Sequence, residues 1–103
     1  MKNMGKMLMQ AQQMQKKMLK AQEELAGERI EGSAGGGGVK VIATGAQEII
    51  EIKINPEVVD SGDIEMLEDL VLVAVKDALE KSKKLMESKM SQITGGLSIP
   101  GML

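Results

Sequence analysis

The sequence contains no Phe, Trp, Tyr, Cys or His, and each absence removes a class of function. Without cysteine there is no disulfide, no thiolate nucleophile and no zinc–thiolate centre. Without histidine, the most common acid–base group and metal ligand near neutral pH is missing. Without aromatic rings the chain cannot stack exposed bases, which argues against the usual readers of single-stranded nucleic acid. Catalysis by lysine or by paired carboxylates is the chemistry that this composition leaves open.

Long apolar segments are also lacking. No run approaches the roughly 18 apolar residues of a membrane-spanning helix, and the N-terminus has no unbroken apolar stretch of the kind found in secretory signals. We therefore expect a cytoplasmic protein with no membrane partner. The length predicts a single domain over residues 1–103. Because large rings normally dominate burial, a small core of Ile, Leu, Val, Met and Ala favours a homodimer, which buries more surface.

Charge is unevenly distributed along the chain, although the net charge is only −2. Residues 1–22 carry five lysines and no acidic residue, and residues 57–69 carry six acidic residues and no basic one. Residues 81–91 carry four lysines against a single glutamate. Two basic segments therefore flank an acidic middle, a polarity that the whole-chain charge conceals.

Apolar residues near the N-terminus recur at alternating intervals of three and four. This spacing predicts a helix over about residues 3–26, ended by Gly27. The stripe comprises Met4, Met7, Ala11, Met14, Met18, Ala21 and Leu25. It can pack on a partner helix or on the chain's own sheet, and both alternatives stay open for its C-terminal half. Methionine and alanine specify a long coiled coil only weakly.

Three strands are predicted after this helix. A short strand covers residues 29–31, and a flexible glycine-rich segment covers 32–38. Alternating β-branched residues predict strands over 39–44 and 49–54, joined by a turn at 44–47. Such short links require antiparallel pairing.

The two faces of this sheet differ in their expected partners. Apolar residues alternate along both strands, and the sheet face that holds Val41 and Ile52 should pack on a helix. Ile42 and Ile49 should lie on the other face, where a monomer would leave them in water. Such leftover apolar surface favours a dimer.

A second long helix is predicted to begin near Ser61 or Asp63 and to end at Gly95-Gly96. Its acidic residues come early and its lysines come late, and each arrangement complements the helix dipole. Residues 97–103 form an uncharged apolar tail. The expected fold class is α+β, with a long N-terminal helix, a three-stranded antiparallel sheet and a long C-terminal helix.

The lysines of the two basic segments are the candidate DNA-binding residues. On the first helix four of five lie away from the apolar stripe, and no acidic residue precedes Glu23. An ordinary solvated face is the alternative, but the second basic segment could lie alongside if the helices pack. Lysine contacts phosphate as a point charge and Arg29 is the only arginine, so binding should follow the DNA backbone more than base sequence. The candidates are Lys2, Lys6, Lys16, Lys17, Lys20, Lys81, Lys83, Lys84 and Lys89.

Two other features resemble chemical motifs but have simpler explanations. The glycine run leads into Val39, Lys40 and a strand, whereas a Walker loop needs Gly-Lys-Ser/Thr at the start of a helix. The carboxylates from Glu57 to Asp69 suit a helix N-terminus and lack the EF-hand pattern. We therefore expect no enzyme, with no catalytic residue, metal site, cofactor or small-molecule substrate.

Four segments occur in a characteristic order along the chain. They are MGKMLMQAQQMQKKM from Met4, then GVKV from Gly38 with IKINPE from Ile52, then EMLEDLV from Glu65 with AVKDA, and finally GGL from Gly95 with a later Pro-Gly. Together they cover nearly the whole chain and resemble the YbaB/EbfC family of bacterial nucleoid-associated proteins.

The resemblance implies a subunit that dimerises through its central region and projects helical arms onto duplex DNA. It implies a cytoplasmic, nucleoid-associated bacterial protein with a role in chromosome organisation or gene expression, and it transfers no fixed base-reading residue. From the residues themselves, the expected dimer and packing contacts are Met7, Met14, Met18, Leu25, Ile42 and Ile49. The alternative is a protein–protein adaptor that docks through its Met-rich N-terminal helix.

Overall fold

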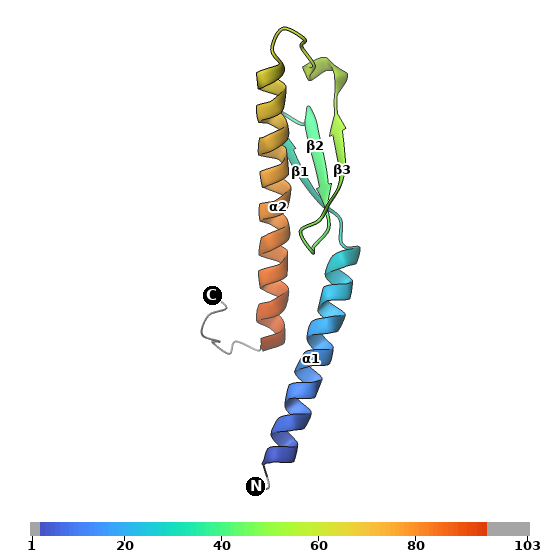
Figure 1. The fold of residues 1–103 in the computed structure, drawn as a ribbon, viewed down its shortest axis with the longest axis vertical. Coiled ribbons are helices and arrows are strands. Elements are labelled where there is room, and N and C mark those ends of the chain that lie inside the picture. The colour runs from blue at the N-terminus through green and yellow to red at the C-terminus, as the bar shows by residue number, and fades with distance from the viewer. Residues whose placement is uncertain (1–2, 95–103) are drawn as a thin grey trace.

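The computed structural model describes residues 3–94 and shows two long helices beside a three-stranded sheet (Figure 1). The elements are, in order, α1 (Met4–Gly27), β1 (Ile30–Ala34), β2 (Val39–Ala43), β3 (Ile49–Ile54), the 3-10 helix η1 (Pro56–Val58) and α2 (Ile64–Thr94). The predicted α+β fold is confirmed. The expected stop at Gly95-Gly96 and the apolar tail at 97–103 lie outside the described residues. No helix among residues 3–94 is long and apolar enough to cross a membrane.

The helices form where the local sequence favours them. The α1 segment holds no β-branched residue and consists almost wholly of Met, Leu, Gln, Lys, Ala and Glu, which are strong helix formers. The start of α2 is fixed by Asp63, whose Oδ1 accepts a hydrogen bond from the Met66 N–H at 3.1 Å. Of the two predicted capping residues, Asp63 is therefore the one that caps α2.

The sheet is an antiparallel meander in the order β1-β2-β3. Gly32, Ser33 and Ala34 belong to β1, so the prediction of one flexible segment over 32–38 is wrong for its first half. Only the glycines that follow form the turn, with φ values of 62°, 63° and 91° at Gly35, Gly36 and Gly37. These left-handed conformations favour glycine, which explains why the run ends β1 in a tight turn and not in a loose linker.

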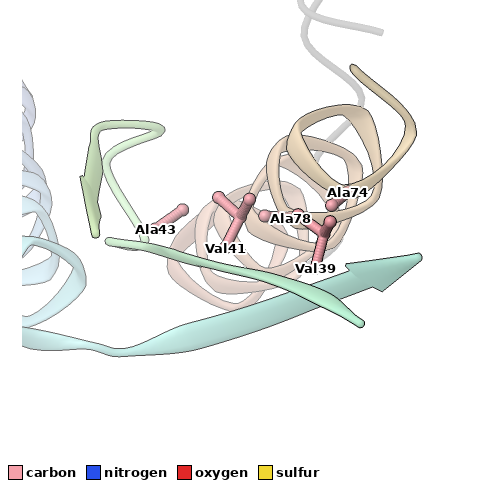
Figure 2. Close-up of a cluster of buried hydrophobic side chains, with 5 residues drawn as sticks. All are labelled: Val39, Val41, Ala43, Ala74 and Ala78. Carbon is pink, nitrogen blue, oxygen red and sulfur yellow. The ribbon is translucent and has the colours of Figure 1, made fainter. Parts of the chain in front are cut away.

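The core lies between β2 and α2, and Figure 2 shows its five side chains. Val39, Val41 and Ala43 of β2 point toward Ala74 and Ala78 of α2, and each is 0% exposed. Small residues on the helix let it approach the sheet closely. Gly32 of β1 faces the same helix, and a Cβ built there would lie 2.5 Å from the Ala74 carbonyl oxygen. The core of this chain, which lacks aromatic rings, is thus filled by close packing of the helix backbone against the sheet.

A register shift in the sheet corrects the expected position of Ile49. Between Ile42 and Ala43 the β2–β3 register slips, so Ala43 pairs with Ile49 while Ile42 pairs with Glu51. Directly paired residues share a face, so Ile49 lies on the helix side, where it packs against the core. The prediction that Ile49 joins Ile42 on the outer face is therefore wrong. Ile42 stays on the outer face, half-buried between Glu31 and Glu51.

The last turns of α1 attach it to the rest of the chain. Ala21 and Leu25 are buried, at 4% and 2% exposed, and the Leu25 carbonyl accepts a hydrogen bond from the Gly45 N–H at 2.8 Å. Met14 and Met18 are half-buried, whereas Met7 is 66% exposed. The C-terminal half of the predicted stripe therefore packs on the chain itself. The N-terminal half projects beyond the end of α2 in a body of 72 × 24 × 16 Å (Figure 1).

Candidate nucleic-acid interface

The lysines of α1 form one basic flank along the projecting helix. At about 100° per residue, Lys6, Lys16, Lys17 and Lys20 fall within an arc of roughly 100° beside the packed stripe. All four are exposed, and none of the ion pairs among residues 3–94 involves them. Lys2 lies outside the described residues. This flank therefore carries positive charge that no neighbouring carboxylate neutralises directly.

The lysines of α2 are mostly paired. Lys81 lies 3.2 Å from Asp77 and also donates to the Glu31 carbonyl, and Lys84 lies 3.5 Å from Glu80. Both are solvent-exposed pairs one turn apart on the helix, which are weak and leave the ammonium groups able to contact a phosphate. Lys83 takes part in no ion pair within the described part of the chain.

Lys89 joins the two helices. Its Nζ lies 2.7 Å from Glu24 Oε2 on α1, and its side chain is only 25% exposed. The hydrogen bond from Lys89 and its positive charge lower the pKa of Glu24, and the charge of Lys20 adds to this effect. The two predicted basic segments therefore do meet, at the C-terminal half of each helix.

A second carboxylate ties α2 to the sheet. Asp77 Oδ2 accepts a hydrogen bond from the Ser33 N–H at 3.0 Å and lies 3.2 Å from Lys81 Nζ. The Ser33 N–H is the main cause of a lowered pKa at Asp77, and Lys81 contributes further. This contact fixes the position of the lysine-bearing half of α2 relative to β1.

The six acidic residues of the 57–69 segment gather at the opposite end of the molecule. Asp60 and Asp63 accept backbone hydrogen bonds from Gly62 and Met66 at 2.9 Å and 3.1 Å, so they shape the entry into α2. Figure 1 places this end of α2 far from the N-terminus of α1. The long axis thus separates an acidic end from a basic end, and a polyanion would approach the basic end. Among residues 3–94, no group of three or more acidic residues is arranged to hold a metal ion.

An apolar groove lies between α2 and β3, and sequence reasoning did not locate it. It has a volume of about 460 Å³ and is lined by Ile54, Leu67, Glu68, Val71, Leu72 and Val75. Because α2 packs over β1 and β2, the helix-side residues of β3 stay uncovered, with Ile52 at 47% and Ile54 at 40% exposed. The apolar positions were visible in the sequence, but which of them the helix leaves open was not.

Comparison with known proteins identifies the family. The model of the YbaB/EbfC DNA-binding family matches residues 1–97. This chain belongs to that family. The resemblance expected from the four ordered segments is thereby confirmed, and it applies to nearly the whole chain.

Related proteins support the same assignment. A nucleoid-associated protein of Caldanaerobacter subterraneus subsp. tengcongensis is 52% identical over 100 residues, covering 97% of this chain and 90% of that protein. A nucleoid-associated protein of Ruminiclostridium cellulolyticum is 55% identical over 101 residues, covering 97% of this chain and 88% of that protein. An uncharacterized protein from Helicobacter pylori has a similar fold, with a TM-score of 0.76 at 19% identity, covering 92% of this chain and 97% of that one.

Proposed function

We propose that this protein binds duplex DNA as a homodimer, mainly through phosphate contacts, and acts in chromosome organisation or gene expression as a nucleoid-associated protein. The observation that carries the proposal is the basic flank of α1, an exposed row of lysines on a helix that projects from the body, in a chain of a DNA-binding family. The overall acidic charge is consistent with this, because six of the acidic residues lie in the 57–69 segment at the far end.

Recognition should depend on the backbone more than on the bases. Lysine supplies a point charge, whereas bidentate reading of guanine is typical of arginine. Arg29 is engaged with its own backbone, donating to the carbonyls of Gly27 at 3.3 Å and Glu28 at 3.2 Å. Few side chains are therefore suited to direct base readout, and Lys6, Lys16, Lys17, Lys20 and Lys83 are the proposed phosphate contacts, with Lys2 as a further candidate.

We place the dimer contact at the groove between α2 and β3. Leu72 lines this groove together with Ile54 and is 52% exposed, and exposed apolar surface of this kind marks interaction sites. The free edge of β3 runs along the same surface, since β3 pairs only with β2 among the described strands. A second copy would cover both features and would bring a second basic α1 flank to the same duplex. In this proposal the groove residues take the place of Ile49 at the dimer surface.

A salt titration of DNA binding tests the phosphate contacts. If about four of these lysines contact phosphates in any one complex, the logarithm of the binding constant should fall against the logarithm of salt concentration with a slope of about −3.6. The combined variant Lys16→Gln, Lys17→Gln and Lys20→Gln should bind more weakly and reduce the slope by roughly 2.7. The matched control is Lys40→Gln, Lys53→Gln and Lys76→Gln, which makes the same charge change away from α1. Equal losses in both variants would show that only overall charge matters.

Light scattering tests the dimer with a pair of neighbouring substitutions. Leu72→Glu places a charge in the groove and should give a monomeric mass, because an unpaired carboxylate at a buried interface is costly. Val73→Glu changes a residue that is 54% exposed on the same helix but does not line the groove, so it should leave the dimer intact. A monomeric wild-type protein at micromolar concentration would contradict the proposal.

The exposed apolar residues of α1 support one alternative, a protein–protein adaptor. Met4, Met7, Leu8 and Met9 are each more than 60% exposed, and methionine adapts to irregular partner surfaces. An adaptor would lose its partner on Met4→Gln with Met7→Gln and would be indifferent to the lysine substitutions. The DNA-binding proposal expects the reverse.

A further inference from the structure

Glu24 is a carboxylate placed among the cations of the proposed DNA-binding surface. Its 2.7 Å contact with Lys89 is the shortest ion pair among residues 3–94, where the others measure 3.2 to 3.6 Å. The Lys89 side chain is also the most shielded lysine of these pairs, at 25% exposed against 53% or more. The other pairs each lie within one helix or strand, whereas this pair bridges α1 and α2.

A second cation approaches the same carboxylate. Lys20 lies one helical turn before Glu24 on the same face of α1, and its charge contributes to the lowered pKa of Glu24. Lys17 precedes Glu24 by about two turns on that flank. The carboxylate of Glu24 therefore holds an ammonium group of α2 and lies on the flank of α1 that carries Lys17 and Lys20.

Carboxylate and phosphate oxygens compete for the same partners. Both accept charge-assisted hydrogen bonds from ammonium groups, and lysine has no acceptor that would distinguish them. The Glu24 side chain is 45% exposed, so solvent reaches its pair with Lys89 and the pair can exchange when a DNA phosphate arrives. A carboxylate at this point also repels the phosphate until the exchange takes place.

We propose that Lys20 and Lys89 form a phosphate-binding site that Glu24 occupies in the free protein, so that DNA binding transfers the Lys89 ammonium group from the carboxylate to a backbone phosphate that Lys20 also contacts. The inference rests on the proposed function and adds to it an inhibitory residue and a contact that spans both helices. In this site Glu24 lowers the affinity for DNA, and Lys89 contributes a phosphate contact in spite of its ion pair. Removal of the carboxylate should therefore tighten binding by more than the change in net charge alone.

Glutamine substitutions at neighbouring positions supply the test. Glu24→Gln should lower the dissociation constant for a short duplex about fivefold, the factor that corresponds to the stronger exposed ion pairs. Glu23→Gln makes the same charge change one residue away, on an exposed position outside the described ion pairs, and should give less than a roughly twofold effect. Glutamine is as good a helix former as glutamate, so both variants should fold.

Lys89 distinguishes a phosphate contact from a purely structural tie. Lys89→Gln should weaken binding and make the salt slope less negative by about 0.9, the value for one lost phosphate contact. In the Lys89→Gln background, the gain from Glu24→Gln should fall to about that of Glu23→Gln, because the two residues act on one site. An unchanged salt slope, or a gain that persists without Lys89, would overturn the inference.

The outcomes separate this inference from the proposed function. Wild-type binding with the expected salt slope, together with equal effects of Glu24→Gln and Glu23→Gln, would refute the Glu24 site alone. Salt-independent binding by the wild type, or no binding by any variant at low salt, would refute the proposed function and this site with it.

Discussion

Gly32→Ala should destabilise the protein, because Gly32 lies directly against the backbone of α2. A Cβ at this residue would lie 2.5 Å from the Ala74 carbonyl oxygen and 2.7 Å from the Ala78 Cα, and closer still to the Ala78 backbone nitrogen. All three atoms belong to the backbone of α2, so no side-chain rotation relieves the contact. Ordinary van der Waals contact begins at 3.4 Å, so Gly32→Ala must push α2 away from β1 by roughly 1 Å.

The energetic consequence of Gly32→Ala follows from the residues that would separate. The displaced helix carries Ala74 and Ala78, which close the core over Val39 and Val41. Overpacking of a tight core typically costs about 1–3 kcal/mol, and a clash that is entirely with backbone should reach about 3 kcal/mol. For a domain of this size, that loss should lower the melting temperature by more than about 10 °C.

Far-ultraviolet circular dichroism during urea or thermal unfolding measures this loss, because the chain has no aromatic fluorophore. Protein concentration must be held constant, since a dimer unfolds at a concentration-dependent midpoint. Gly5→Ala is the control: it lies inside α1, nothing lies within 4 Å of its added Cβ, and it should leave stability unchanged or raise it by up to about 1 kcal/mol. A Gly32→Ala variant within about 0.5 kcal/mol of wild type would refute the close-packed contact.

Two further predictions concern polar contacts of α2. The buried Ser82 hydroxyl donates to the Thr44 carbonyl at 2.7 Å and accepts from the Gln47 N–H at 3.1 Å. Ser82→Ala should therefore lower the free energy of unfolding, measured in urea, by about 1–3 kcal/mol. The control is Ser88→Ala at an exposed position, which should lower it by less than about 0.5 kcal/mol. Asp77 has a pKa below its ordinary value of 3.8, so its stabilising effect is present above that value and is lost as the pH falls through the lowered pKa. Asp77→Asn should therefore lose less stability than wild type on acidification to low pH, and an identical pH profile for both proteins would contradict the Ser33 contact.

Much of the fold follows from local sequence patterns. The three-four spacing and the helix-forming composition predict α1 to within a residue at each end, and the alternation of β-branched residues predicts β2 and β3. These patterns succeed because they record which face of an element is buried, and burial dominates folding energetics. Glycine content predicts flexibility over 32–38, but glycine at position 32 is required by contact with Ala74 and Ala78 of α2, more than forty residues later in the chain.

The candidate site, too, could be predicted from the sequence only in part. Exposed lysines on α1 could be located from the sequence, because an amphipathic helix with a known apolar stripe fixes where its polar residues point. The pairing of Lys89 with Glu24 could not, since residues 65 positions apart meet only when α1 and α2 pack antiparallel. The groove between α2 and β3 was equally out of reach, because it depends on how far the helix extends across the sheet.

Local sequence is enough to predict the elements, their order, the separation of acidic and basic charge along the chain and the family. Each of these depends on composition or on spacing within one segment, which the chain carries without reference to its fold. Three features depend on the folded chain: α1 packs on its own subunit at Leu25, the register shift beside Ala43 turns Ile49 toward the core, and Glu24 pairs with Lys89. These features arise where segments distant in sequence meet, because a shift of one residue in register or a small displacement of a helix changes which side chains touch.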